Sequence, residues 1–307
     1  LVDEAYQMSF AKYNAIVSLA NRHVLIGDPG QINPIHTANI TRWKGMGVTS
    51  EMSTPKALHI QNPQTVYFQL PTSRRLPFDS VQFVQPTFYP NHQFDSLDTG
   101  SDRQIRFQDN QQPIWFSSVF NRMTQGESLL WLEYKDKPIF NKDIDLLDQM
   151  VLFVRVLLSR KGQVFDHSEW KDIEDRNIGI ACPHVIQSNY LQSKLRTEFP
   201  NIRIETFEKF QGLERSIMLV CHPLSGESQI DKGHGDSGKM SVALSRHRNN
   251  CIVFGRANIG NLVTTRTPSN ERYFDSTLNE DEYNWGVQNK LYSLMVHSQR
   301  IIHMEGA

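Results

Sequence analysis

Two short apolar runs, each ending abruptly in acidic and amide residues, constrain the fold of this 307-residue chain more than any other feature. The first opens the chain and ends in Asp-Glu-Ala-Tyr-Gln at residues 3–7, and the second ends in Asp-Pro-Gly-Gln at residues 28–31. Buried parallel strands have this form, because they are apolar along their length and present polar groups at their carboxyl ends. We therefore predict two neighbouring strands of a doubly wound α/β sheet, joined by a helix over residues 9–20.

The polar groups at these two strand ends are those that hydrolysis of a magnesium nucleotide requires. Asp3 is predicted to hold Mg²⁺, and Glu4 to polarise the attacking water. Gln7 and Gln31 are neutral amides that can bind the terminal phosphate or the water beside it, and Gly27 allows the backbone to approach closely. For the Asp-Glu pair on its own, a solvated strand end is the simpler interpretation, and the second strand is what favours a nucleotide site.

Three later strings carry groups suited to the same chemistry. Two arginines, Arg74 and Arg75, stand at the expected passage between domains, and Phe-Gln-Gly-Leu-Glu at residues 210–214 precedes an apolar run. Val-Ala-Leu-Ser-Arg at residues 242–246 precedes another such run. A guanidinium group in a nucleotide cleft neutralises charge that develops in the transition state, although a pair of solvated arginines is the alternative at residues 74–75.

In this order the strings resemble motifs II to VI of the superfamily 1 helicases and translocases, with the nonsense-mediated-decay type as the nearest branch. The resemblance covers roughly residues 1–255. It implies RecA-like P-loop NTPase sheets, with ATP and Mg²⁺ in a cleft between two α/β domains. The implied roles are catalysis for Glu4, Gln31, Arg75 and Arg246, metal binding for Asp3, and nucleotide binding for Asp3, Gln7, Gly27, Asp28, Gln211, Gly212 and Glu214.

Two features depart from the family pattern. His247 stands where a small residue is usual, so it is expected either to crowd the preceding helix or to point to solvent. The phosphate-binding string G-x-x-x-x-G-K-S/T occurs nowhere in the chain. We interpret the chain as a carboxyl-terminal piece of a longer protein. The piece begins at motif II, and we expect it to be inactive by itself.

The resemblance also divides the chain. Residues 1–72 are predicted to be the later half of a first RecA-like domain, with an irregular insertion at about residues 33–63. Residues 73–260 would form a complete second RecA-like domain that carries motifs IV, V and VI. Residues 261–307 would be a carboxyl-terminal helical extension.

A single-stranded nucleic acid is the partner that the resemblance implies, and a protein loading partner stays open. DNA is favoured over RNA because no feature of the sequence reads a 2′-hydroxyl group. Thr206 and Trp43 are the predicted contacts, although for Trp43 the packing of a loop onto its domain is the favoured alternative. Two other functions remain open: an ATPase switch that remodels nucleoprotein without unwinding, and a non-catalytic module that binds nucleic acid.

Composition adds few constraints. The chain has 32 basic and 33 acidic residues, so its net charge of −1 gives no evidence for or against nucleic acid. Cys182, Cys221 and Cys251 each lie in a short apolar run without a second ligand at metal spacing, and are predicted to be core thiols. No apolar run is long enough to span a membrane, and a cytoplasmic location is the default expectation.

Overall fold

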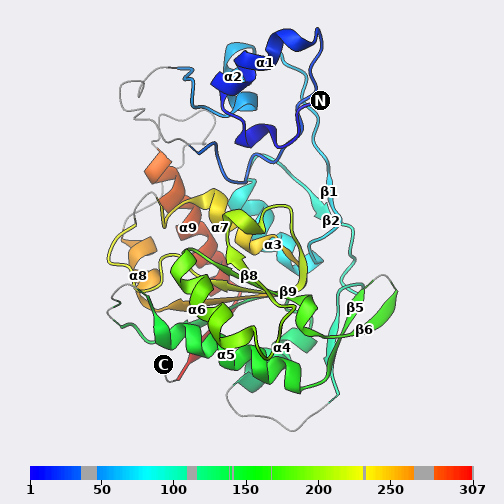
Figure 1. Ribbon diagram of the computed structural model, residues 1–307, viewed down its shortest axis with the longest axis vertical. Helices are drawn as coiled ribbons and strands as arrows, with labels where there is room; N and C mark the ends of the chain where they lie inside the picture. The colour runs from blue at the N-terminus through cyan, green and yellow to red at the C-terminus, as the bar shows by residue number, and fades with distance from the viewer. Residues whose placement is uncertain are drawn as a thin grey trace.

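The computed structural model describes residues 1–35, 47–108, 116–137, 139, 142–166, 168–230, 233–265 and 280–305, with the side chains of residues 280–282 left aside. Figure 1 shows an N-terminal unit at one end of the molecule and a larger body that contains the main sheet. An extended segment links the two, at about residues 62–71.

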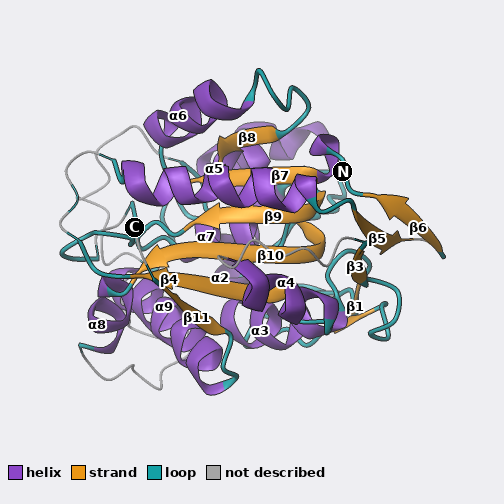
Figure 2. Ribbon diagram, turned by 90° about the horizontal axis from the view of Figure 1, so that it is seen from below, coloured by secondary structure: helices purple, strands orange, loops and turns teal. Residues whose placement is uncertain are grey.

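The body is built on a six-stranded sheet in which every neighbouring pair of strands is parallel. Its strand order is β11-β4-β10-β9-β7-β8, and the strands run side by side in Figure 2. Such a sheet needs helical crossovers and is apolar along its strands, as predicted for an α/β fold of RecA type. The strands are β4 (Leu129–Tyr134), β7 (Ile178–Cys182), β8 (Arg203–Thr206), β9 (Arg215–Cys221), β10 (His247–Arg256) and β11 (Ile301–Met304).

Helices cover both faces of this sheet, and each face has its own apolar core. One core joins the sheet to α4 (Ser117–Thr124), α5 (Ile144–Ser159) and α6 (Val185–Leu195). The other joins it to α3 (Phe78–Phe88), α7 (Ser237–Leu244), α8 (Asn258–Thr264) and α9 (Glu280–His297). The body is therefore a three-layer α/β domain.

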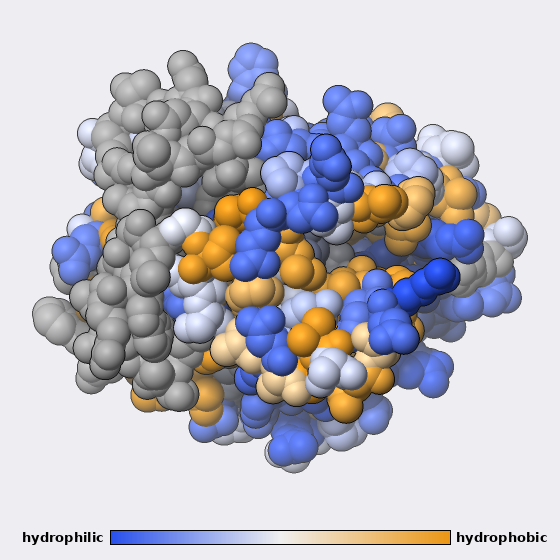
Figure 3. Space-filling model, turned by 90° about the horizontal axis from the view of Figure 1, so that it is seen from above, coloured by the Kyte–Doolittle hydropathy of each residue, from blue (hydrophilic) through white to orange (hydrophobic). Residues whose placement is uncertain are grey.

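The N-terminal unit contains the first two predicted strands as a minimal parallel pair. Val2 and Leu25 form an isolated parallel bridge, and α1 (Phe10–Ile16) and α2 (Thr54–Gln61) pack beside it. Ser9 caps α1 as expected, by accepting from the Lys12 amide. Figure 3 shows this end of the molecule, where apolar side chains lie among polar ones. Leu1 and Val24 are 86% and 59% exposed, although parallel strands are normally covered on both faces.

Two small sheets lie outside the main one. β1 (Thr72–Ser73) and β2 (Asp95–Ser96) form a short parallel pair. β3 (Ile105–Phe107), β5 (Gly162–Asp166) and β6 (Glu169–Asp172) form an antiparallel sheet, which we call the accessory sheet. The accessory sheet reaches the functional region through Asp166, as described below.

Some local expectations were wrong. Helix α2 lies within the predicted irregular insertion, and α3 and α4 lie within residues 78–125, which had no periodic pattern strong enough to predict helices. The closing helix was predicted, and its residues Trp285, Leu291 and Met295 are buried. The strand that follows was not: β11 pairs with β4 and becomes an edge of the main sheet, so residues 261–307 are not purely helical.

The cysteines are core thiols, as predicted. Cys182, Cys221 and Cys251 are unpaired and buried, and burial raises the pKa of the Cys221 thiol to about 12. Within the described ranges, no group of three or more His, Cys, Asp or Glu side chains is arranged to hold a metal ion. The helices of the described part include none that is long and apolar enough to cross a bilayer.

Candidate functional site

The two polar strand ends lie side by side, as the sequence predicts. The Val2 amide donates to the carbonyl of Val24, and the Ile26 amide donates back to Val2, both at 2.8 Å. A methyl group added at Gly27 would lie 2.9 Å from the Ala5 nitrogen. Gly27 is therefore needed where the second strand end passes the first, which supports its predicted role in close backbone approach.

The Asp-Glu pair stands on an exposed turn. Glu4 has a left-handed backbone, with φ of 52°, and its amide donates to Asp3 Oδ1 at 2.9 Å. The Gln7 amide nitrogen donates to Glu4 Oε2 at 2.8 Å. The turn thus orients the carboxylates of Asp3 and Glu4 with Gln7 beside them, and leaves both acids accessible to a metal ion and water.

Asp28 fastens the second strand end to the body of the protein. Its carboxylate accepts from the Gly30 amide at 2.9 Å, from the Gln31 side chain at 2.7 Å and from the Tyr89 hydroxyl at 3.0 Å. Tyr89 follows α3 and its hydroxyl also lies 3.3 Å from Ser241 Oγ on α7. Tyr89 thus anchors this strand end beside α3 and α7.

Gln31 contacts the string at residues 210–214 directly. The Gln211 side-chain nitrogen donates to Gln31 Oε1 at 3.2 Å. The start of α7 also passes close, because a methyl group at Gly238 would lie 2.6 Å from the Gln31 carbonyl oxygen. Gly212, which follows Gln211 in the chain, has φ of +76° and therefore forms a tight turn beside this contact.

Arg75 and Arg246 are the basic groups of this site. Arg246 is buried, with 2% of its surface exposed, and its Nε donates to the carbonyl of Val242 at 3.2 Å. Its Nη2 and the Nε of Arg75 are buried without hydrogen-bond partners. In the described part of the chain, neither arginine has an ion-pair partner within 4.0 Å.

Electrostatics shows which groups share the neighbourhood of Arg246. Burial, with the nearby charge of Arg75 as a second cause, lowers the pKa of this guanidinium group to about 10. Tyr89, Asp28 and Glu4 act in the opposite direction on that pKa. Two cations and the carboxylates of the N-terminal unit therefore converge, while the cations lack direct partners. A phosphate anion would satisfy them.

His247 does neither of the things predicted for it. It is fully buried, and its Nε2 lies 2.6 Å from Ser80 Oγ on α3. Ser80 in turn lies 2.6 Å from Ser128 Oγ. Burial lowers the pKa of His247 to about 3, and the charge of Arg75 contributes. The imidazole therefore ties the residue next to Arg246 to α3 as a neutral core group.

Two predicted site residues, Glu214 and Thr206, stand apart from this convergence. Glu214 is exposed, and its carboxylate lies 3.6 Å from Nη1 of Arg248. Thr206 is buried at the carboxyl end of β8. Trp43 lies outside the described residues, so its predicted contact with nucleic acid stays a prediction.

Sequence reasoning missed four participants: Tyr89, Ser241, Arg248 and Asp166. Arg248 follows Arg246 at a spacing of two residues, and that position in the string was the available signal. Tyr89 and Asp166 are isolated in sequence from every motif, and only the fold brings them to the site.

ATP with a divalent metal ion fits the donor set of this site. Asp3 and Glu4 are exposed oxygen donors of the kind that Mg²⁺ prefers, and Arg75 and Arg246 present buried nitrogen atoms that lack partners. Gln31 and Gln211 bridge the acidic strand ends to the basic side. The arrangement can therefore hold a phosphate group between the acidic turn at Asp3 and Glu4 and two cations.

Comparison with known proteins identifies the family of the chain. A model of the family AAA_12, described as an AAA domain, matches residues 58–258. The chain is 23% identical over 267 residues to the "DNA replication ATP-dependent helicase/nuclease JHS1" of Arabidopsis thaliana, covering 83% of this chain and 18% of that protein. It is 23% identical over 284 residues to the "DNA replication ATP-dependent helicase/nuclease DNA2" of Xenopus laevis, covering 83% of this chain and 24% of that protein. The chain thus spans about a fifth of the length of these curated relatives.

Among solved structures, an arterivirus helicase (nonstructural protein 10) matches 82% of this chain and 38% of its own, with a TM-score of 0.37 and 12% identity. The family match covers well over half of the chain and includes three of the ordered strings, those at Arg75, at residues 210–214 and at residues 242–246. This chain belongs to the AAA_12 family of AAA domains.

Proposed function

We propose that this chain is the part of an ATP-dependent helicase or translocase that closes on the terminal phosphate of ATP. The observation that carries the proposal is the pair of guanidinium groups at Arg75 and Arg246, which are held near each other without ion-pair partners. Bringing two cations together away from water is unfavourable unless an anion is bound between them. The names of the curated relatives support ATP as the source of that anion.

Each group has a distinct proposed role. Asp3 holds Mg²⁺, and Glu4 accepts the proton of the attacking water. Gln31 binds the water or the terminal phosphate, with Gln7 beside it, and Arg75 and Arg246 neutralise the charge that develops on the transferred phosphoryl group. Gln211, Gly212 and Glu214 are proposed to contact the nucleotide. ATP and Mg²⁺ together supply the phosphoanhydride bond and the charge neutralisation of its oxygens.

The division into domains is part of the proposal. Residues 1–72 would represent the later half of a first RecA-like domain, and the exposed parallel pair around Val2 and Leu25 supports it, since such strands are normally covered. Residues from 73 onward would form the second domain, with the strand at 301–304 added to its sheet. No G-x-x-x-x-G-K-S/T string occurs in the sequence, so little or no hydrolysis is expected from this chain alone.

Motion along a single strand of nucleic acid is the proposed use of the energy released. The names of the relatives specify DNA replication, which favours DNA over RNA. Thr206 lies at the carboxyl end of β8, at the edge of an α/β sheet where ligands commonly bind, which supports its proposed contact with nucleic acid. A protein loading partner and a cytoplasmic location stay predictions.

The test is ATP hydrolysis by the full-length natural protein, with and without single-stranded DNA or RNA, for the native enzyme and for Glu4→Gln. Stimulated hydrolysis that the substitution abolishes would support a motor. Hydrolysis without strand separation would favour the ATPase switch, and absence of hydrolysis with either nucleic acid would favour the non-catalytic module.

A further inference from the structure

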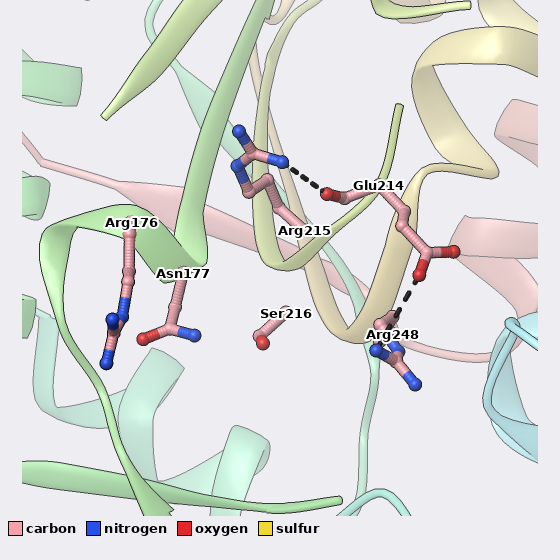
Figure 4. A pocket seen from close by; sticks show the side chains of 6 residues that line it. All are labelled: Arg176, Asn177, Glu214, Arg215, Ser216 and Arg248. Carbon is pink, nitrogen blue, oxygen red and sulfur yellow. Dashed lines mark hydrogen bonds and ion pairs between the residues drawn. The ribbon is translucent and has the colours of Figure 1, made fainter. Parts of the chain in front are cut away.

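A basic pocket that shares only Glu214 with the proposed nucleotide contacts lies where three parallel strands of the main sheet begin. Arg176 and Asn177 immediately precede β7, Arg215 and Ser216 open β9, and Arg248 is the second residue of β10. Figure 4 shows these side chains around one hollow, with Glu214 at its rim. We call this hollow the arginine pocket. Arg75, Arg246 and Gln31 are not among the residues that line it.

Arg248 is held in place at one side of the arginine pocket. Its Nη2 lies 3.3 Å from Oδ1 of Asp166, and its Nη1 lies 3.6 Å from Oε1 of Glu214. Asp166 ends β5 of the accessory sheet and also pairs with Arg103. Because carboxylates on two different elements hold it, the Arg248 side chain is positioned before any ligand arrives, which lowers the entropic cost of binding.

Arg215 carries a charge that its own contacts satisfy only in part. Its Nη1 donates to the backbone carbonyl of Glu214 at 2.7 Å, but its Nε is buried with no hydrogen-bond partner. Burial lowers the pKa of this guanidinium group, and the neighbouring charge of Arg203 adds to the effect. A half-buried cation beside another cation is unfavourable, and a bound anion would offset that cost.

The other lining groups narrow the chemistry of the ligand. The Ser216 hydroxyl and the Asn177 amide are neutral hydrogen-bond donors among three guanidinium groups, a combination suited to the oxygens of a phosphate. Glu214 places one carboxylate at the rim, where it would repel a continuous strand of phosphodiesters but could accept a bond from a hydroxyl group. Charge and donors together therefore favour a small ligand.

We propose that the arginine pocket binds the phosphate group of a small phosphate monoester, at a site that the residues proposed to hydrolyse ATP do not line. The guanidinium groups of Arg176, Arg215 and Arg248 supply the positive charge. Ser216 and Asn177 complete the set of donors.

Isothermal titration calorimetry of this chain tests the proposal, with inorganic phosphate and glycerol 3-phosphate as probes at fixed ionic strength. Ser216→Asp places a carboxylate inside the pocket and is expected to weaken binding of both probes at least tenfold, whereas Ser216→Thr keeps the hydroxyl and is expected to bind within about threefold of the native chain. Arg155→Ala is the surface control, because Arg155 pairs with Glu198 away from the pocket. Far-ultraviolet circular dichroism confirms that each variant is folded.

Equal binding by the native chain and Ser216→Asp, or no binding by the native chain, would overturn the assignment. A single-stranded oligonucleotide without terminal phosphates serves as the second arm. If it displaces the monoester and its affinity falls with Ser216→Asp, the pocket binds a nucleic-acid backbone instead. Neither result depends on ATP hydrolysis, so failure here is distinguishable from failure of the proposed motor function.

Discussion

The side-chain nitrogen of Gln211 donates a hydrogen bond at 3.2 Å to the side-chain oxygen of Gln31, which lies 180 positions earlier in the chain. This bond joins the strand end that follows Gly27 to the turn that contains Gly212. Together with the bond from the Tyr89 hydroxyl to Asp28, it links the N-terminal acidic groups to the body that carries Arg246. Closure of a nucleotide cleft requires communication of this kind, because groups from both sides must reach one phosphate.

The Gln31–Gln211 bond is expected to couple the two units energetically. In a double-mutant cycle with Gln31→Ala and Gln211→Ala, measured by urea unfolding, the interaction energy should be about 0.5–1.5 kcal/mol. Gln31→Ala combined with Gln163→Ala is the control, and should be additive, because Gln163 lies on the accessory sheet. Additivity in the first cycle would show that the N-terminal unit does not dock through this bond.

Replacement of Gly212 tests the turn that carries Gln211. Gly212 has φ of +76° and no atom within 4 Å of an added methyl group, so Gly212→Ala should destabilise the chain through backbone strain alone, by about 1–2 kcal/mol. Gly286 is equally open but lies within α9. Gly286→Ala should therefore stabilise by about 0.5–1 kcal/mol, since alanine favours helices. Thermal unfolding would show the opposite signs, and a shared sign would contradict the account.

Arg246 should lower the stability of the unliganded chain, because it is buried without a counter-charge. Arg246→Met is expected to raise the free energy of unfolding by about 1–4 kcal/mol while removing ATP hydrolysis from the full-length natural protein. Arg256 is the matched control: it is equally buried, but its Nε and Nη2 both donate to Asp143 at 2.7 Å. Arg256→Met should cost about 3–5 kcal/mol, since it leaves a buried carboxylate unpaired. Loss of stability in both variants would show that Arg246, like Arg256, has a stabilising partner, and would contradict the structure.

His247 should make the chain less stable in mild acid. Its pKa is lowered to about 3 by burial, whereas an unfolded histidine titrates near its ordinary value. The unfolded state then binds more protons between these two values, so stability is full at neutral pH and falls as pH drops below about 6.5. From pH 7 to pH 5 the loss expected from His247 alone is roughly 2 kcal/mol.

Urea unfolding at both pH values would measure that loss, and His247→Asn should reduce it. The other buried histidine, His222, also has its pKa lowered to about 3 by burial, and His222→Asn should reduce the loss independently. His59 is exposed on α2, so His59→Asn is the surface control for the substitution. An unchanged dependence in the His247 variant would contradict its burial as a neutral group.

Strand ends and motif turns were the parts of the site that the sequence could predict. A short apolar run that stops at acidic residues has few possible structures other than a buried parallel strand. The pairing of Val2 with Leu25 follows that rule. The need for glycine at positions 27 and 212 could also be predicted. A side chain at Gly27 would collide with the first strand end, and one at Gly212 would strain the backbone. These features depend on local chemistry, which a sequence records directly.

Contacts between distant segments were not predictable in this way. Tyr89 reaches Asp28 only because α3 lies between the N-terminal unit and α7. That helix could not be predicted, because residues 78–88 lack the regular apolar spacing that indicates a helix. Strand β11 was missed because four residues near the end of a chain carry too little pattern. His247 was assigned to a clash or to solvent, and its partner Ser80 lies 167 positions away.

The proposed ATP hydrolysis depends above all on Glu4, which acts on water beside a phosphate that Arg75 and Arg246 bind. The most direct test measures ATP hydrolysis by the full-length natural protein in the presence of single-stranded DNA, for the native enzyme, Glu4→Gln and Glu198→Gln. Glu198 pairs with Arg155 on the surface, so its substitution makes the same chemical change away from the site. We expect stimulated hydrolysis that falls about 100-fold or more with Glu4→Gln and stays unchanged with Glu198→Gln. Equal rates for all three proteins would contradict the assignment of the catalytic base and of the site around it.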